Sequence, residues 1–99
     1  MTATALTMTG AQLLGAAESR AGATTFTAVD PRTAAPLSPQ FHGATPNDVE
    51  RALDLARAAH PAFELVGRER RAALLEAIAT GIEDLGMPLL ERASAETGL

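Results

Sequence analysis

Few side chains in this 99-residue sequence combine the type and spacing that chemistry requires. A nucleophilic serine is typically held in a tight turn such as a G-x-S-x-G elbow, and no serine here has that setting. His42 and His60 each lack a second metal-ligand residue at the usual spacing, so surface or capping roles are expected. Glu83 and Asp84 are adjacent and point in different directions on a helix, so they cannot face one site together. The serines are Ser19, Ser38 and Ser94.

Two residue types that carry out covalent chemistry are missing from the sequence. Without cysteine it can form no disulfide, thiolate metal site or thiol nucleophile. Without lysine it can form neither a Schiff base nor the lysine contact of a P-loop. The eight glycines make no G-x-G-x-x-G or Walker pattern. The residues therefore predict no catalytic, cofactor-binding or metal site in this chain.

The charge pattern argues against nucleic acid and membrane partners. The formal charge is −4, and the densest basic group, Arg68, Arg70 and Arg71, has Glu64 and Glu69 beside it. This mixture is typical of a solvated helix start rather than of a phosphate-binding patch. The first nineteen residues carry no basic side chain and are interrupted by polar residues, which fits neither a signal peptide nor a membrane span. A soluble, cytoplasmic protein is expected.

The size of the chain allows one small core of limited stability. Only 3% of the residues are aromatic, so the core must consist mainly of Ala, Leu, Ile and Val. Alanine buries little area, and apolar burial contributes roughly 25 cal/mol per Å². The composition is therefore already suggestive of a piece of a larger protein.

Residues 1–44 are expected to form short strands and loops, arranged as a β-hairpin or meander. Three apolar or β-branched segments are separated by glycine and by Asp30-Pro31. Pro39 cannot donate to a strand ladder, so its segment should be an edge strand or merely extended chain. The segments are Gln12–Gly15, Thr24–Val29 and Leu37–Phe41.

Residues 45–99 are expected to form three helices. Thr45 can cap the first, with Pro46 in its first turn and Asp48 near its positive end. Pro61 should end or bend this helix near His60. A second helix is expected from Arg68 to Leu85, and Gly86 is placed to end it. Its buried face should hold Leu74, Leu75, Ile78, Ile82 and Leu85.

The third helix should begin at Pro88, because proline is favoured in a first helical turn. It should continue through Leu89, Leu90 and Ala93, with Gly98 as the stop. The expected fold class is therefore an α+β fragment.

The order of these features resembles the start of the aldehyde dehydrogenases. The blocks that carry the resemblance span nearly the whole chain, and their blend is similar to the alpha-ketoglutaric semialdehyde dehydrogenases. One departure is Ala34, which stands where the family's Asn-Pro-Ala-Thr-Gly turn has glycine; another is His60-Pro61. The blocks are Leu13–Gly15, Phe26–Thr33, Ala44–Ala52, Arg71–Ala79 and Glu96–Gly98.

The resemblance implies that residues 1–99 form the amino-terminal part of an NAD(P)-binding domain in a longer, oligomeric enzyme. NAD or NADP would serve the full-length protein, and the catalytic cysteine, general base and cofactor loops would all come later. Some relatives bind a monovalent cation, which would nominate Ala28, Val29 and Glu96 here. The alternative is that these residues are strand backbone and a helix-end carboxylate.

Other kinds of protein remain open at this point. The chain could be a free-standing helical interaction module, with the apolar face of the second helix recruited to a partner. It could also be a degenerate remnant without a role. The aldehyde substrate, the choice between NAD and NADP and the oligomeric state depend on residues outside the sequence.

Overall fold

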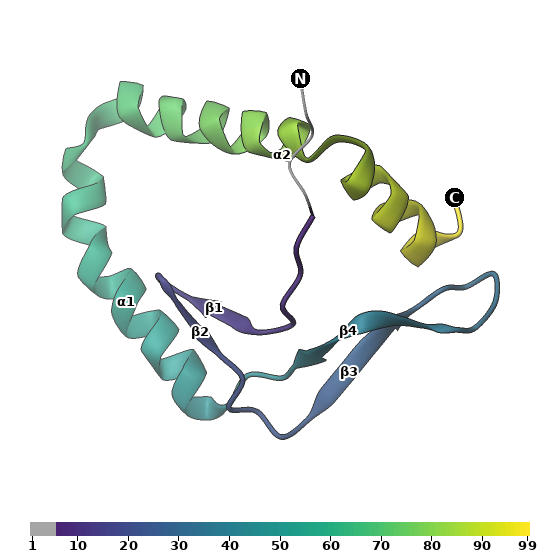
Figure 1. Ribbon diagram of the computed structural model, residues 1–99. Helices are drawn as coiled ribbons and strands as arrows, with labels where there is room; N and C mark the ends of the chain where they lie inside the picture. The colour runs from purple at the N-terminus through teal and green to yellow at the C-terminus, as the bar shows by residue number, and fades with distance from the viewer. Residues whose placement is uncertain (1–5) are drawn as a thin grey trace. The chain divides into compact units, whose positions relative to one another are not determined.

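The computed structural model describes residues 6–99, which form four short strands and two helices (Figure 1). This composition agrees with the expected α+β class. Assignment to a cofactor-binding domain remains a prediction. The strands are β1 (Gln12–Leu14), β2 (Ala17–Ser19), β3 (Thr25–Val29) and β4 (Pro36–His42), and the helices are α1 (Pro46–Leu65) and α2 (Gly67–Thr97).

The chain divides into two compact units. The first, here called the hairpin unit, comprises residues 9–27 and 38–65. The second, the helix unit, comprises residues 28–37 and 66–99 together with the described residues before Thr9. Each unit therefore draws on both halves of the sequence.

Strands β1 and β2 form an antiparallel hairpin in the hairpin unit. Leu14 pairs with Ala17 across a two-residue turn, in which Gly15 has φ 60°. Glycine adopts this left-handed conformation without the clash that a Cβ causes, which is why it suits tight hairpin turns. The sequence predicted β1 and missed β2.

Strands β3 and β4 form the second two-stranded sheet, and both were predicted. Asp30 closes the turn between them, because its carbonyl accepts from the Ala34 N–H at 2.8 Å and its carboxylate accepts from the Arg32 N–H at 2.8 Å. Ala34 has φ 60°, so alanine occupies the left-handed position of the turn. A two-stranded sheet has only edge strands, which explains how Pro39 is accommodated in β4.

Helix α1 begins as the sequence predicts. The Thr45 hydroxyl accepts from the Asp48 N–H at 3.0 Å, and the Asp48 carboxylate accepts from the Thr45 N–H at 2.9 Å. These reciprocal bonds form a capping box, with Pro46 as the first helical residue. Of the two predicted effects of Pro61, an end or a bend near His60, the end is wrong, because α1 continues through Pro61 to Leu65. Proline removes one helical hydrogen bond, and the neighbouring bonds can carry the helix past it.

Helix α2 is a single element with a break, so the prediction of three separate helices is not confirmed. The break falls at Gly86, which has φ 58° and ψ −141° and was the expected end of the second helix. Figure 1 shows the chain changing direction within α2. Gly98, with φ 77°, caps α2 and donates from its N–H to the Ser94 carbonyl at 2.9 Å. The predicted stop at Gly98 is confirmed.

Very few of the described side chains are buried. Leu14 is 7% exposed and Asp48 is 6% exposed. The residues expected to be buried on the second helix lie largely in solvent: Leu74 is 46% exposed and Leu75 67% exposed, and Leu85 is half-buried. Burial of that face is therefore a wrong prediction for this chain, since the described residues supply no surface to cover it.

Candidate functional site

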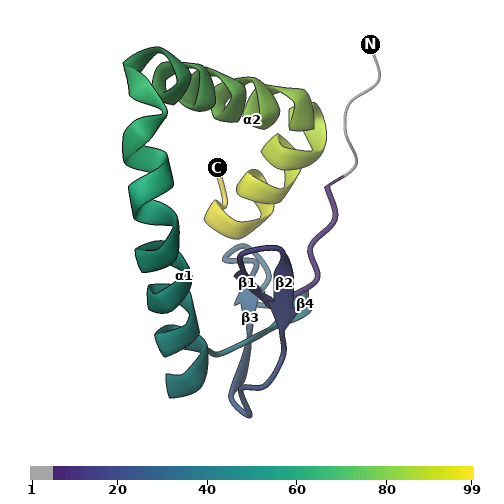
Figure 2. The same ribbon diagram turned by 90° about the vertical axis from the view of Figure 1, so that its left-hand side faces the viewer.

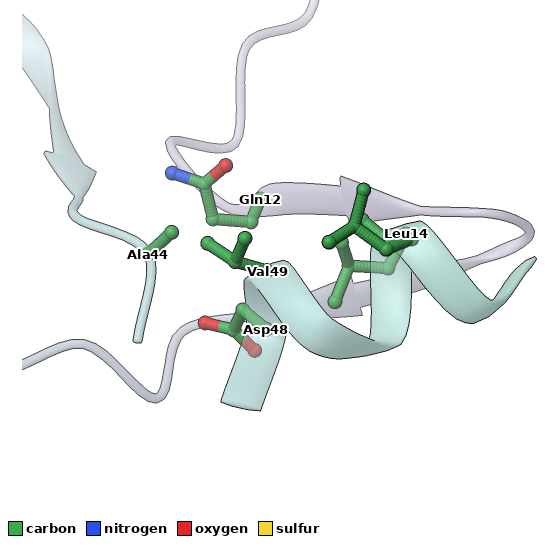
Figure 3. Close-up of a pocket in the computed structure, with 7 residues that line it drawn as sticks. Gln12, Leu14, Ala44, Asp48 and Val49 are labelled. Carbon is green, nitrogen blue, oxygen red and sulfur yellow. The ribbon is translucent and has the colours of Figure 1, made fainter. Parts of the chain in front are cut away.

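A shallow pocket in the hairpin unit is the best candidate for a site. It has a volume of about 260 Å³ and lies where β1 meets the first turns of α1. Figure 2 shows the β1–β2 hairpin beside α1, and Figure 3 shows the labelled lining residues. The pocket is lined by Gln12, Leu14, Ala44, Asp48, Val49, Ala52 and Leu53.

Asp48 is the acidic group of this pocket, and its carboxylate is held by two separate segments of the chain. It accepts from the Ser19 hydroxyl in β2 at 2.8 Å as well as from the Thr45 N–H. The Thr45 backbone bond and then the Ser19 bond lower the pKa of Asp48 below its ordinary value of 3.8, against the opposing effect of burial. A carboxylate with a lowered pKa is a weak base, so Asp48 is suited to holding β2 against α1 rather than to proton transfer.

Gln12 is the second polar residue of the pocket, and it is also engaged. Its side-chain Nε2 donates to the His42 carbonyl at 2.7 Å, which ties β1 to the end of β4. The remaining lining side chains are aliphatic. The pocket can therefore seat an apolar group. Its lining residues do not include a nucleophile together with a general base.

The pocket does not fit a dinucleotide. The phosphates of NAD or NADP require backbone N–H groups at a glycine-rich turn or basic side chains. The lining of this pocket has neither, and it places the Asp48 carboxylate where an anion would be repelled. Cofactor binding by this pocket is therefore not supported.

The two histidines lie apart from the pocket lining. His60 is exposed on α1, with Nε2 3.8 Å from the Glu64 carboxylate. This agrees with the expected surface role. His42 is half-buried at the end of β4, where its N–H donates to the Gly10 carbonyl at 2.9 Å and its Nδ1 lies 3.4 Å from the Gly22 carbonyl. It is therefore neither a surface residue nor a helix cap.

The hydroxyls of Ser19 and Ser94 make hydrogen bonds to other segments of the chain, and the adjacent acids Glu83 and Asp84 lie on the surface. Ser19 donates to Asp48 as described, and the Ser94 hydroxyl accepts from Arg32 at 3.1 Å and donates to the Leu99 carbonyl. Arg32 also donates to the Leu99 carbonyl at 3.0 Å, a favourable place for a cation near a helix carboxyl end. Glu83 and Asp84 are exposed on α2.

The residues nominated for a monovalent cation show no metal-type cluster. The Glu96 carboxylate accepts from Arg92 Nε at 3.1 Å, an i,i+4 ion pair of the kind common on helix surfaces. Across residues 6–99, no group of three or more His, Asp and Glu side chains is placed to hold a metal ion. Glu96 is thus ion-paired within α2, and the cation site that would add backbone oxygens of Ala28 and Val29 stays a prediction.

Sequence comparison relates the chain to the aldehyde dehydrogenases. It is 47% identical over 93 residues to a protein named alpha-ketoglutaric semialdehyde dehydrogenase 2, from Azospirillum brasilense. The match covers 93% of this chain and 18% of that enzyme. The resemblance read from the sequence blocks, including its subfamily, is thus confirmed, and the chain corresponds to a segment of its relative.

Two further comparisons were negative. No protein-family model matches the chain, and no solved structure matches it. Neither helix of the described region is long and apolar enough to cross a membrane.

Proposed function

We propose that this chain is the amino-terminal segment of an NAD(P)-dependent aldehyde dehydrogenase that oxidises an aldehyde to a carboxylic acid. The observation that carries the proposal is the 47% identity over nearly the whole chain to a dehydrogenase of which it spans only 18%. The name of that relative makes alpha-ketoglutaric semialdehyde the candidate substrate. As in the sequence-based expectation, the complete enzyme would be a cytoplasmic homo-oligomer.

In this proposal the segment contributes structure, and the rest of the enzyme contributes catalysis and cofactor binding. The chain contains no cysteine, so it cannot supply a thiol nucleophile. The candidate pocket does not fit a dinucleotide phosphate, and its polar side chains bond to neighbouring backbone and hydroxyl groups. We expect the 99-residue chain alone to be inactive.

The coding sequence beyond Leu99 provides the first test. We expect an open reading frame that encodes a glycine-rich cofactor loop followed by a cysteine. A stop codon with neither feature downstream would contradict the proposal.

A chimera provides the second test. The matched segment of the Azospirillum enzyme is replaced by this chain, and aldehyde-dependent formation of NADH or NADPH is measured. We expect activity within about tenfold of the parent enzyme, because the segment holds no reacting group and its substitution perturbs packing alone. Complete loss of activity in a soluble chimera would contradict the proposal.

The exposed apolar side chains also fit a free-standing interaction module. The two functions differ in the behaviour of the purified 99-residue chain. A module should unfold in one cooperative, monomeric thermal transition, whereas a segment with an uncovered interface should aggregate or unfold without cooperativity. Calorimetry combined with sedimentation distinguishes them.

A further inference from the structure

The part of α2 that follows the break at Gly86 carries a depression of about 420 Å³. Most of its lining comes from one side of the helix, because positions three and four residues apart share a helical face. Arg32 completes the lining from the β3–β4 turn, which belongs to the same compact unit as this part of α2. The depression is lined by Arg32, Met87, Leu90, Glu91, Ser94 and Ala95.

Arg32 is held in place by two acceptors at the end of α2. Its Nη2 donates to the Ser94 hydroxyl at 3.1 Å and to the Leu99 carbonyl at 3.0 Å. Within residues 6–99, its Nε and Nη1 have no hydrogen-bond partner. The guanidinium is therefore restrained at one nitrogen and keeps donors at the other two, and such donors suit a carboxylate.

Glu91 places the opposite charge on the same depression. It lies three residues before Ser94, so about one helical turn separates it from the residue that holds Arg32. Glu91 and Arg32 form no ion pair with each other, and the Glu91 carboxylate has no hydrogen-bond partner in the described part of the chain. Two opposite charges that share a depression without pairing favour a ligand that carries both complementary charges.

The apolar part of the lining limits the ligand further. Met87 and Leu90 are exposed side chains, and methionine is flexible enough to adapt to the shape of what it contacts. They can cover a short alkyl chain. A dicarboxylate or a phosphate would be repelled by Glu91, and a diamine would be repelled by Arg32.

We propose that this depression binds a free α-amino acid with an unbranched apolar side chain. The carboxylate of the ligand accepts from Arg32, its ammonium group donates to Glu91, and its side chain lies on Met87 and Leu90. A residue inside a peptide does not fit, because amide bonds replace its two charged groups. The site lies wholly within this chain and goes beyond the dehydrogenase function proposed above.

Titration of the isotope-labelled 99-residue chain with three related compounds tests the proposal. L-Norleucine carries both charges, hexanoate lacks the ammonium group, and pentylamine lacks the carboxylate. We expect norleucine to give saturable shifts in the amide resonances of residues 87–95, with a Kd on the order of 1 mM for a ligand of this size. Hexanoate and pentylamine should each bind at least about fivefold more weakly, since each loses one charged hydrogen bond.

Glu91→Gln and Glu76→Gln are the matched variants, because both remove an exposed acid from α2 and only Glu91 lines the depression. We expect Glu91→Gln to weaken norleucine binding by at least about fivefold and to strengthen hexanoate binding, since the repulsion of its carboxylate is removed. Glu76→Gln should leave both affinities unchanged. Arg32→Gln should abolish the preference for norleucine over pentylamine.

Several results would overturn the amino-acid site. One is hexanoate or pentylamine binding to the unsubstituted chain as tightly as norleucine does, because the pair of charges would then not be read. Others are norleucine shifts confined to the hairpin unit, equal affinities of the Glu91→Gln and Glu76→Gln chains, and a chain without a dispersed amide spectrum, since the site requires the fold of this chain. The chimera described above tests the proposed function separately, because aldehyde oxidation does not depend on this titration.

Discussion

Asp48 shows how one carboxylate can organise a small unit. It accepts from Thr45 in the chain before the helix and from Ser19 in β2, and its own N–H donates back to Thr45. Sequence reasoning found the Thr45 cap and the preference of Asp48 for a helix start, because both are local rules. It could not find Ser19, whose partner is 29 residues away. Contacts at that separation leave no spacing signal.

The Asp48 network predicts a defined pH dependence. The hydrogen bonds of the Asp48 carboxylate lower its pKa in the folded state. At pH values above the ordinary pKa of 3.8 these bonds therefore stabilise the hairpin unit fully. The stabilisation is lost as the pH falls through the lower folded-state pKa. We expect Asp48→Asn to unfold more readily than the unsubstituted chain at pH 7, with the difference shrinking below about pH 4. Urea unfolding followed by circular dichroism at both pH values measures this.

Ser19→Ala serves as the comparison for Asp48→Asn, because it removes one donor and keeps the capping box. We expect a smaller loss of stability with the same pH trend. An Asp48→Asn chain as stable as the original at pH 7 would show that the network contributes nothing.

Ala34 makes a second prediction at the scale of the residue. A left-handed φ of 60° costs an L-residue about 1–2 kcal/mol of strain in the folded state. Glycine adopts this φ without strain, but it costs about 0.4–1 kcal/mol because it gives the unfolded chain more conformational entropy. Ala34→Gly should therefore stabilise the β3–β4 turn by about 0.5 kcal/mol. Ala35→Gly is the control, since Ala35 lacks a positive φ and should only lose stability. Equal effects of both variants on the thermal midpoint would refute the argument.

Among the secondary-structure elements, two glycines are expected to respond oppositely to the same substitution. A Cβ on Gly22 would lie 1.8 Å from the Gly43 carbonyl oxygen, so Gly22→Ala must push two backbone segments apart at a cost of about 1–3 kcal/mol. A Cβ on Gly81, within α2, would meet open space, and Gly81→Ala should strengthen the helix by about 0.5–1 kcal/mol. Chemical unfolding of both variants measures the two signs, and a Gly22→Ala chain of unchanged stability would contradict the close approach.

The elements themselves were partly readable from the sequence. Patterns of apolar residues and turn formers found β1, β3, β4, the start of α1 and the break at Gly86. Strand β2 was missed because Ala17–Ser19 is too short for alternation to be visible. The end of α1 was misplaced because the rule that proline stops helices neglects the bonds on either side of Pro61 that hold the helix together.

For the whole molecule, the boundary between the two units predicts where a protease cuts. Leu65 is 86% exposed at the end of α1, and Gly67 follows with φ 84° before Arg68 in the first turn of α2. Helix ends open more easily than helix interiors. We expect limited trypsin digestion to cleave after Arg68 several times faster than after Arg57, which lies inside α1. Mass spectrometry of early time points identifies the sites, and earlier cleavage at Arg57 would refute the prediction.

Only the composition of the sequence, with few aromatic residues and many alanines, indicated that the helices would be exposed. Periodicity identifies which side of a helix prefers burial, and it says nothing about whether the same chain supplies the cover. Ile78 and Ile82 have the spacing of core residues and are half-exposed in this chain. A pocket such as the one beside Leu14 is equally invisible in the sequence, since it depends on how β1 meets α1.

The bond from Ser19 to Asp48 also has a consequence for the order of folding during synthesis. A ribosome releases β1 and β2 well before the first turn of α1, so the hairpin must wait for Asp48 to emerge before its last anchor can form. Closing the loop between Ser19 and Asp48 costs chain entropy, and a newly made chain can form this bond only after the start of α1 has left the ribosome. Until then the nascent hairpin can open and close freely.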